Sequence, residues 1–135
     1  MTTNTPQTFV PGFRLIDGTD LNNALAQPTW QTNPGLTALA GGGRTGATAL
    51  VYGINELTTV TTTSDSCVLP DGKAGGVVVL RNSGAQTTQV YAQDSDTING
   101  TAGSTGISVA ASKTVIFFAV NDVAGVTTWV SLLTA

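Results

Sequence analysis

Apolar residues occur in short runs along most of the chain, and clusters of Pro, Gly, Asn, Asp and Ser separate these runs. The clearest runs lie at residues 67–69, 77–80 and 89–92, between the turn sequences Pro-Asp-Gly, Asn-Ser-Gly and Asn-Gly. Short β-branched and apolar runs between such clusters predict β-strands joined by tight turns. The pattern therefore predicts a compact β domain around the stretch from Ser66 to Gly100.

Further strands are expected on both sides of this stretch. Residues 54–62 are rich in Thr and predict a strand, although Leu50, Val51, Ile54 and Leu57 would also suit one face of a helix or of a helical turn that leads into the strand. Residues 107–109, 113–121 and 126–132 follow, and the last two are expected to pair as an antiparallel hairpin. About seven strands at roughly 8–12-residue spacing predict an all-β fold, an antiparallel β-sandwich or jelly roll.

The run at 113–121 is apolar on both of its faces. Val115, Phe117 and Ala119 alternate with Ile116, Phe118 and Val120. A strand with one solvated face would alternate apolar and polar residues, so both faces of this strand require a cover. One cover is the domain core, and the other is an arm, a second sheet or another subunit. Ile116 and Phe118 are therefore candidate interface residues.

The first 48 residues differ from the rest of the chain and are expected to form an extended N-terminal arm and linker, followed by a β-sandwich domain at 49–135. Thr19 is a suitable N-cap for one short helix that ends before Pro28. Residues 28–48 are rich in Pro, Gly and Thr, which predicts a linker with a flexible hinge at Gly41–Gly43. The apolar residues of the arm are candidate interface residues: Phe9, Val10, Phe13, Leu21, Leu25 and Trp30.

Composition and charge narrow the functional classes. Only 10 % of the 135 residues are charged, against about 25 % in an ordinary soluble domain, and Thr, Ser, Asn and Gln supply the polarity. The net charge is −3 and the five basic residues are scattered, so no nucleic-acid partner is expected. No apolar run reaches the roughly 20 residues that span a bilayer, and no membrane partner is expected. The N-terminus lacks the features of a secretory signal, which predicts synthesis in a cytoplasm.

The sequence offers little for catalysis, and we expect no enzyme activity and no cofactor. The chain has no His, which excludes Ser–His and Cys–His nucleophiles, and the lone Cys67 has no partner for a disulfide or a zinc site. The stretch 41–48 resembles a phosphate-binding loop but has Ala47 where the loop needs lysine. The acidic stretch 94–100 lacks the spacing of a calcium loop, so turn chemistry explains it better than a metal. A surface on which sugars stack is an alternative, and four aromatic residues could form it: Trp30, Tyr52, Tyr91 and Trp129.

Several segments resemble a recurrent domain of tailed-bacteriophage virion proteins. They are INELTTVTTTSDSCVLP, GGVVVLRNSGAQTTQVYAQDSDTING and GISVAASKTVIFFAV, preceded by FRLIDGTDLNNAL, which is similar to the lead-in of that domain. The resemblance covers roughly residues 13–132 and consists of strand and turn patterns without catalytic signatures. It implies a small structural component such as a capsid decoration (cement) protein, a head fibre, or a tail or baseplate module.

Among these structural components, a capsid protein is favoured by three features. The chain is short, it has an N-terminal arm, and at least one strand has apolar residues on both faces. The expected function is a non-catalytic decoration protein that binds the outer surface of the head and stabilises the shell through oligomeric and arm contacts. Its expected partners are the major capsid protein and further copies of itself, as a trimer in preference to a dimer, and its expected place is the capsid surface of the virion. The alternative is a tail, fibre or head-fibre module that binds host surface carbohydrate.

Overall fold

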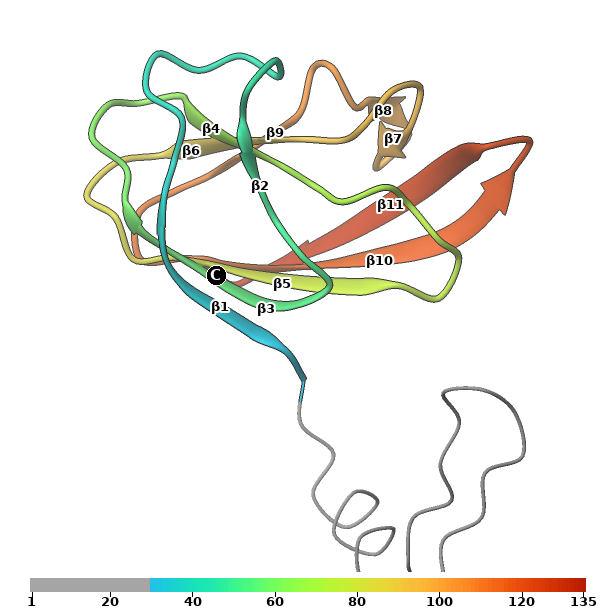
Figure 1. Ribbon diagram of the computed structural model, residues 1–135, viewed down its shortest axis with the longest axis horizontal. Helices are drawn as coiled ribbons and strands as arrows, with labels where there is room; N and C mark the ends of the chain where they lie inside the picture. Colours follow the sequence, from blue (N-terminus) through green and yellow to red (C-terminus); the bar gives the residue numbers. More distant parts are fainter. Residues whose placement is uncertain (1–29) are drawn as a thin grey trace, which may run out of the picture. The chain divides into compact units, whose positions relative to one another are not determined.

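A computed structural model describes residues 30–135, and within this range the chain is all-β and contains no helix. Residues 31–135 form one compact unit of two mixed sheets that lie in two layers (Figure 1). The all-β prediction is confirmed, and the layered arrangement is sandwich-like. The expected short helix and the candidate residues Phe9, Val10, Phe13, Leu21 and Leu25 lie outside the described residues.

The larger sheet has seven strands in the order β1-β3-β5-β10-β11-β7-β8, and the smaller sheet has four in the order β2-β4-β6-β9. The strands of the larger sheet are β1 (Thr32–Thr37), β3 (Gly53–Thr59), β5 (Val77–Asn82), β7 (Thr97–Ile98), β8 (Thr101–Ala102), β10 (Thr114–Val123) and β11 (Val126–Leu133). Those of the smaller sheet are β2 (Thr48–Ala49), β4 (Asp65–Val68), β6 (Thr88–Tyr91) and β9 (Ile107–Val109).

The prediction of antiparallel sheets is wrong, because five of the nine strand pairs are parallel. The first six strands alternate between the two sheets along the chain. Each strand in one sheet is followed by a crossing to the other layer, so the next strand in the first sheet runs in the same direction as its predecessor. This winding makes β1, β3 and β5 parallel in one layer and β2, β4 and β6 parallel in the other. Only the later part of the domain contains the hairpin of β10 and β11 that the sequence predicted.

The expected boundary near residue 48 also differs from the structure. Residues 32–37 form β1, which pairs with β3, and residues 48–49 form β2, which pairs with β4. The expected hinge is packed in place, because the amide of Gly41 donates to Oδ1 of Asp65 at 3.1 Å and the carbonyl of Gly43 accepts from Oγ of Ser66 at 2.7 Å. A linker prediction from Gly and Pro content fails here because the backbone of this stretch makes hydrogen bonds to the sheets.

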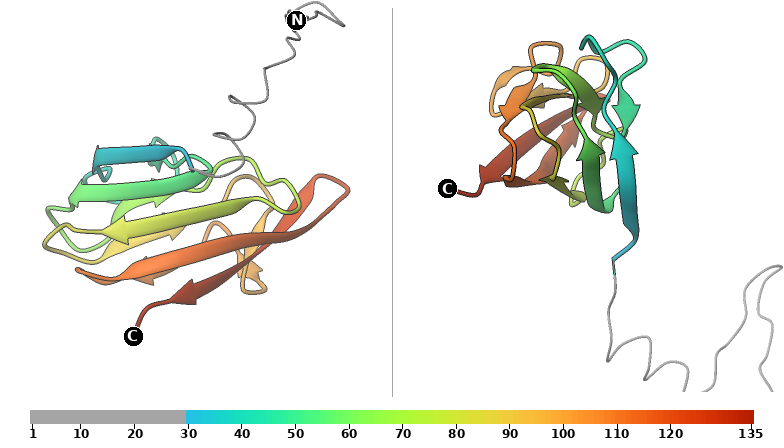
Figure 2. Two further views of the ribbon diagram at one scale, coloured as in Figure 1. Left: turned by 90° about the horizontal axis from the view of Figure 1, so that it is seen from below. Right: turned by 90° about the vertical axis from the view of Figure 1, so that its left-hand side faces the viewer.

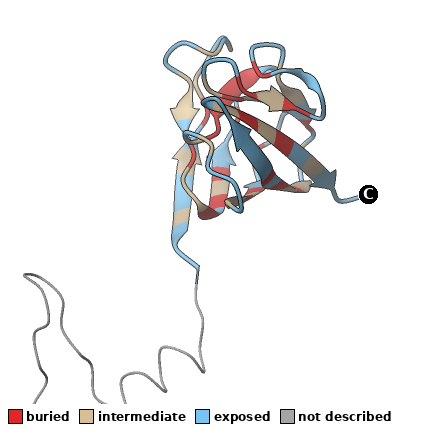
Figure 3. Ribbon diagram, turned by 90° about the vertical axis from the view of Figure 1, so that its right-hand side faces the viewer, coloured by how far each residue is buried: buried red, intermediate tan, exposed pale blue. Residues whose placement is uncertain are grey.

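The core lies between the two layers and is built from alternate residues of the strands. Figure 3 shows buried and exposed segments following one another along the ribbon. Trp129 and Phe117 are the largest fully buried side chains, and the ring of Tyr52 stacks on that of Trp129 with centroids 6.3 Å apart. Burial of side chains of this size contributes about 1.5–3 kcal/mol each. The register that places Phe117 and Trp129 inward therefore decides which residues of β10 and β11 face outward.

Candidate binding surface

The outward side of the seven-stranded sheet carries two adjacent rows of apolar side chains. In the first row, the strand register places Ile54, Val79, Ile116 and Leu132 side by side on β3, β5, β10 and β11. In the second row, it aligns three more residues on β5, β10 and β11, which are Val77, Phe118 and Val130. These seven residues are called the outer apolar face below. Figure 2 (left) looks onto the strands that carry it.

The side chains of the outer apolar face are partly open to solvent. Leu132 is 64 % exposed, Ile54 and Phe118 are each 41 % exposed, and Val130 is 38 % exposed. Val77, Val79 and Ile116 are half-buried between them. Contiguous exposed apolar patches larger than a few hundred Å² are rare on monomeric soluble proteins and mark binding surfaces. The arrangement can therefore remove a continuous apolar area from water when it meets a suitable surface.

Polar side chains border the face at one end of the strands. Glu56 and Arg81 are cross-strand neighbours there, and Arg81 pairs with Thr114 of β10. The carboxylate of Glu56 accepts from Oγ of Ser83 at 2.7 Å, and Nη1 of Arg81 donates to the carbonyl of Ser112 at 2.9 Å. The apolar rows thus end at a rim that holds one charge of each sign.

Sequence reasoning identified only part of this surface. Ile116 and Phe118 lie on it, as neighbours on the outward side of β10, whereas Trp30 lies before β1 and is 52 % exposed. The five other members were missed: Ile54, Val77, Val79, Val130 and Leu132. Their signal was present in the apolar residues at alternate positions on the strands, but the register that aligns them could not be known from the sequence. An interface role for the candidate residues stays a prediction.

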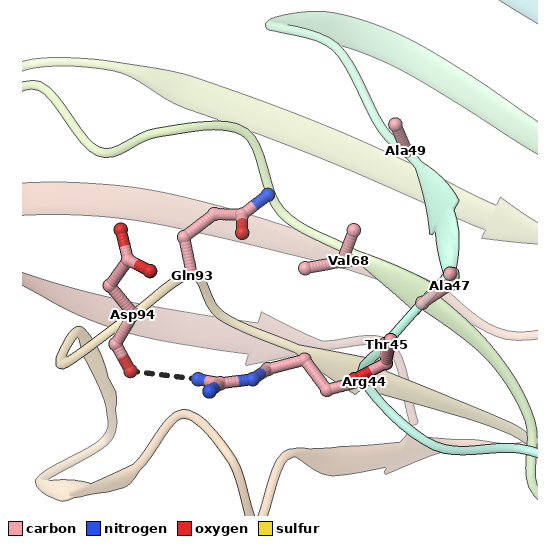
Figure 4. Close-up of a pocket in the computed structure, with 8 residues that line it drawn as sticks. Arg44, Thr45, Ala47, Ala49, Val68, Gln93 and Asp94 are labelled. Atoms are coloured by element: carbon pink, nitrogen blue, oxygen red, sulfur yellow. Dashed lines mark hydrogen bonds between the residues drawn. The ribbon is translucent and has the colours of Figure 1, made fainter.

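A cavity of about 390 Å³ lies beside β2 and the β4 end (Figure 4). Its polar lining residues are Arg44, Thr45, Gln93 and Asp94. Nη1 of Arg44 donates to the backbone carbonyl of Asp94 at 2.7 Å, so part of its hydrogen-bonding capacity holds the loop in place. The cavity includes no residue of the outer apolar face.

A smaller cavity of about 150 Å³ is lined by four aspartates, among other residues: Asp71, Asp94, Asp96 and Asp122. Oδ1 of the buried Asp96 accepts a hydrogen bond from the amide of Thr127 at 2.7 Å, which ties the acidic turn to β11. Among residues 30–135, no group of three or more His, Cys, Asp or Glu side chains is arranged to hold a metal ion. The hydrogen bond of Asp96 gives this turn a structural role.

Two of the four aromatic residues considered for carbohydrate stacking are not free surface rings in the described domain. Trp129 is fully buried, and the hydroxyl of Tyr52 donates to the carbonyl of Asp71 at 2.6 Å. Burial raises the pKa of Tyr52, and the nearby carboxylates of Asp71 and Asp96 add to the effect. These two rings belong to the core and its margin.

Cys67 lies in the core and is fully buried. Burial raises the pKa of its thiol to about 12, so the thiolate that nucleophilic chemistry requires is scarce at neutral pH. This position contributes packing to β4 and no evident reactivity.

No family model matches the chain, and no curated protein is similar enough to be recognised as related to it. None of the described residues belong to a helix long and apolar enough to cross a membrane.

Proposed function

We propose that the protein is a capsid decoration protein of a tailed bacteriophage, which binds the outer surface of the head and stabilises the shell without catalysis. The attribution to a phage virion rests on the resemblance of the strand and turn segments over roughly residues 13–132. The observation that carries a binding role is the outer apolar face. Seven apolar side chains on four neighbouring strands have no cover among residues 30–135, and their burial is favourable at about 25 cal/mol per Å².

The proposed partners are the major capsid protein and further copies of this chain. Many copies on one shell act together, so modest contacts per copy add up to firm attachment through multivalency. The low content of charged residues suits a surface that is largely covered in an assembly, since charged residues are depleted at the cores of interfaces. The proposed place of the protein is the capsid surface, after synthesis in the cytoplasm of the bacterial host.

A tail or fibre module that binds host carbohydrate is the alternative raised by the sequence. It would require aromatic rings open to solvent in one cluster, and burial of Trp129 removes the largest ring of the described domain from such a cluster. No feature described for residues 30–135 favours this alternative over attachment to a shell.

The proposal is tested by locating the protein on purified phage particles. A gold-labelled antibody raised against the β domain should mark the head surface in electron micrographs, at many sites per particle. Particles from a phage with the gene deleted should carry no label and should lose their DNA at a lower temperature. Label confined to the tail or its fibres would contradict the proposal and favour the alternative.

A further inference from the structure

We propose that the outer apolar face pairs with the same face of a second copy of this chain, related to the first by a two-fold axis. This inference rests on the proposed function for its biological setting, but it concerns the isolated protein and is tested without phage particles. It names the occupant of the face as an identical sheet. Three properties of the described structure support that choice, namely the size, the shape and the charge of the face.

The outward side of the four strands, with the outer apolar face at its centre, is close in size to what a specific dimer needs. Neighbouring strands lie about 4.8 Å apart and rise about 3.4 Å per residue, so four strands over about eight residues cover roughly 19 by 27 Å, of which the two apolar rows occupy about half and polar rows the rest. That corresponds to a projected area on the order of 500 Å² per copy, and protruding side chains increase the accessible area above this value. Specific interfaces begin at about 600 Å² per partner. The face therefore suits a dimer of moderate affinity.

The shape of the face suits a second sheet better than a ligand or an inserted helix. The seven side chains belong to neighbouring strands of one continuous sheet, and neither cavity described above includes any of them. Two sheets with the same twist pack face to face at about −30° and about 10 Å apart, with their side-chain rows interleaved. An identical copy necessarily brings a sheet of the same twist, with branched side chains at the same spacing.

The charge distribution permits pairing of the face with itself. A two-fold interface brings the same patch from both copies together, so a like charge at its centre would repel its own counterpart. Apolar residues fill both central rows, while Glu56 and Arg81 lie as neighbours of opposite sign in the next row. Pairing therefore places the apolar rows of both copies in contact and leaves a mixed-charge rim at the margin.

Analytical ultracentrifugation of the full-length chain and of matched variants tests the pairing. The wild-type protein should sediment as a dimer that dissociates at micromolar concentration. Leu132→Asp puts a carboxylate at the most exposed member of the face, where the folded monomer accommodates it. This variant should weaken dimerisation by about 100-fold or more, as expected for a charge placed within the core of an interface. Phe118→Asp should do the same from the second row.

Val123→Asp is the matched control, because Val123 is 65 % exposed near the end of the β10–β11 hairpin and outside both rows. Its dimerisation should equal that of the wild type. Near-ultraviolet circular dichroism of the buried Trp129 verifies that each variant is folded. Because the wild-type measurement needs no variant, the proposal remains testable even if a substitution prevents folding.

Three results would overturn the inference. A wild-type chain that stays monomeric up to about 100 µM has no self-association of the expected strength. A trimer excludes simple two-fold pairing, and a dimer unaffected by Leu132→Asp uses another surface. A monomeric chain that binds phage shells and loses this binding with Leu132→Asp would assign the face to the shell, which would refute self-pairing while supporting the proposed function.

Discussion

At position 65, a buried carboxylate lies at the start of β4, an inner strand of the smaller sheet. Oδ2 of Asp65 accepts from the amides of Thr61 and Thr62 at 2.9 Å, while Oδ1 accepts from the amide of Gly41 and the hydroxyl of Thr62. The hydrogen bonds from Thr62 are the main cause that lowers the pKa of Asp65 from 3.8 to about 2. One side chain thereby fixes two loops at the start of β4.

Acid should weaken the domain through this residue. Because the pKa of Asp65 is lower in the folded chain, its contribution to the free energy of unfolding is complete above about pH 4 and is lost as the pH falls toward 2. The urea midpoint of the wild type should therefore drop over this window. Asp65→Asn should have a lower midpoint at pH 7 but a smaller further drop in acid. Asp122→Asn, at an exposed position, should keep the full wild-type drop, and an equal drop in the Asp65 variant would contradict the argument.

Asn82 is a second buried polar residue, and its side chain forms hydrogen bonds with three backbone groups. Its Nδ2 donates to the carbonyls of Gln86 and Val109 at 2.9 Å each, and its Oδ1 accepts from the amide of Gly84 at 3.0 Å. Asn82→Ala leaves these backbone groups without a partner, which should lower the free energy of unfolding by about 2–4 kcal/mol. Chemical denaturation measures this loss. Asn121→Ala at an exposed position should change it by less than about 0.5 kcal/mol, and similar values for both variants would refute the role of Asn82.

At the scale of the elements, most strands but few pairings could be predicted from the sequence. The runs that became β5, β6, β9, β10 and β11 have strong apolar or β-branched patterns, and the hairpin turn before Val126 follows from local chemistry. β1 was not predicted from the sequence because it contains Pro34 and Gly35, which lower strand propensity but are tolerated at the edge of a sheet. Strand propensity is a local property, whereas the parallel pairs of this domain join residues about twenty or more positions apart, such as Thr32 and Ile54.

The pairing of β1 with β3 depends on Gly53 at the start of β3. Gly53 has φ +104, and a Cβ atom there would lie 2.3 Å from the carbonyl oxygen of Gln31, which accepts the amide of Ile54 at 2.9 Å. Gly53→Ala should thus detach the start of β1 in addition to straining the backbone. Gly75→Ala is the matched control, because Gly75 also has a positive φ, +85, but open space around it.

Both glycine variants should share a backbone cost of about 1–2 kcal/mol, and Gly53→Ala should lose clearly more than that. Amide hydrogen exchange should accelerate at Ile54 in Gly53→Ala and remain at the wild-type rate there in Gly75→Ala. Equal stability losses and equal exchange rates at Ile54 would show that the close approach of Gln31 has no consequence for the edge of the sheet.

At the scale of the whole molecule, the outer apolar face arises from the winding of the chain. Two crossings between the layers, from β3 to β4 and back to β5, place β5 beside β3, and the late hairpin then adds β10 and β11 to the same sheet. Ile54 and Leu132 are far apart in sequence and share one row only because of these steps. The apolar residues on both faces of the run at 113–121 indicate that its outward face also needs to be covered, and the partial exposure of Ile116 and Phe118 is consistent with this. The sequence alone does not show which neighbouring strands continue that outward face.

Deletion of residues 1–30 is expected to separate folding from attachment. Both sheets and the described core lie within residues 31–135, so the truncated chain should keep the near-ultraviolet signal of the buried Trp129 and a cooperative urea transition. If the apolar residues of the arm supply the proposed contacts with neighbouring subunits, the truncated chain should lose most of its binding to phage shells that lack the protein. Co-sedimentation with such shells measures this binding, with the full-length chain as the reference. Undiminished binding by the folded truncated chain would exclude the arm from attachment and leave the β domain as the part that contacts the shell.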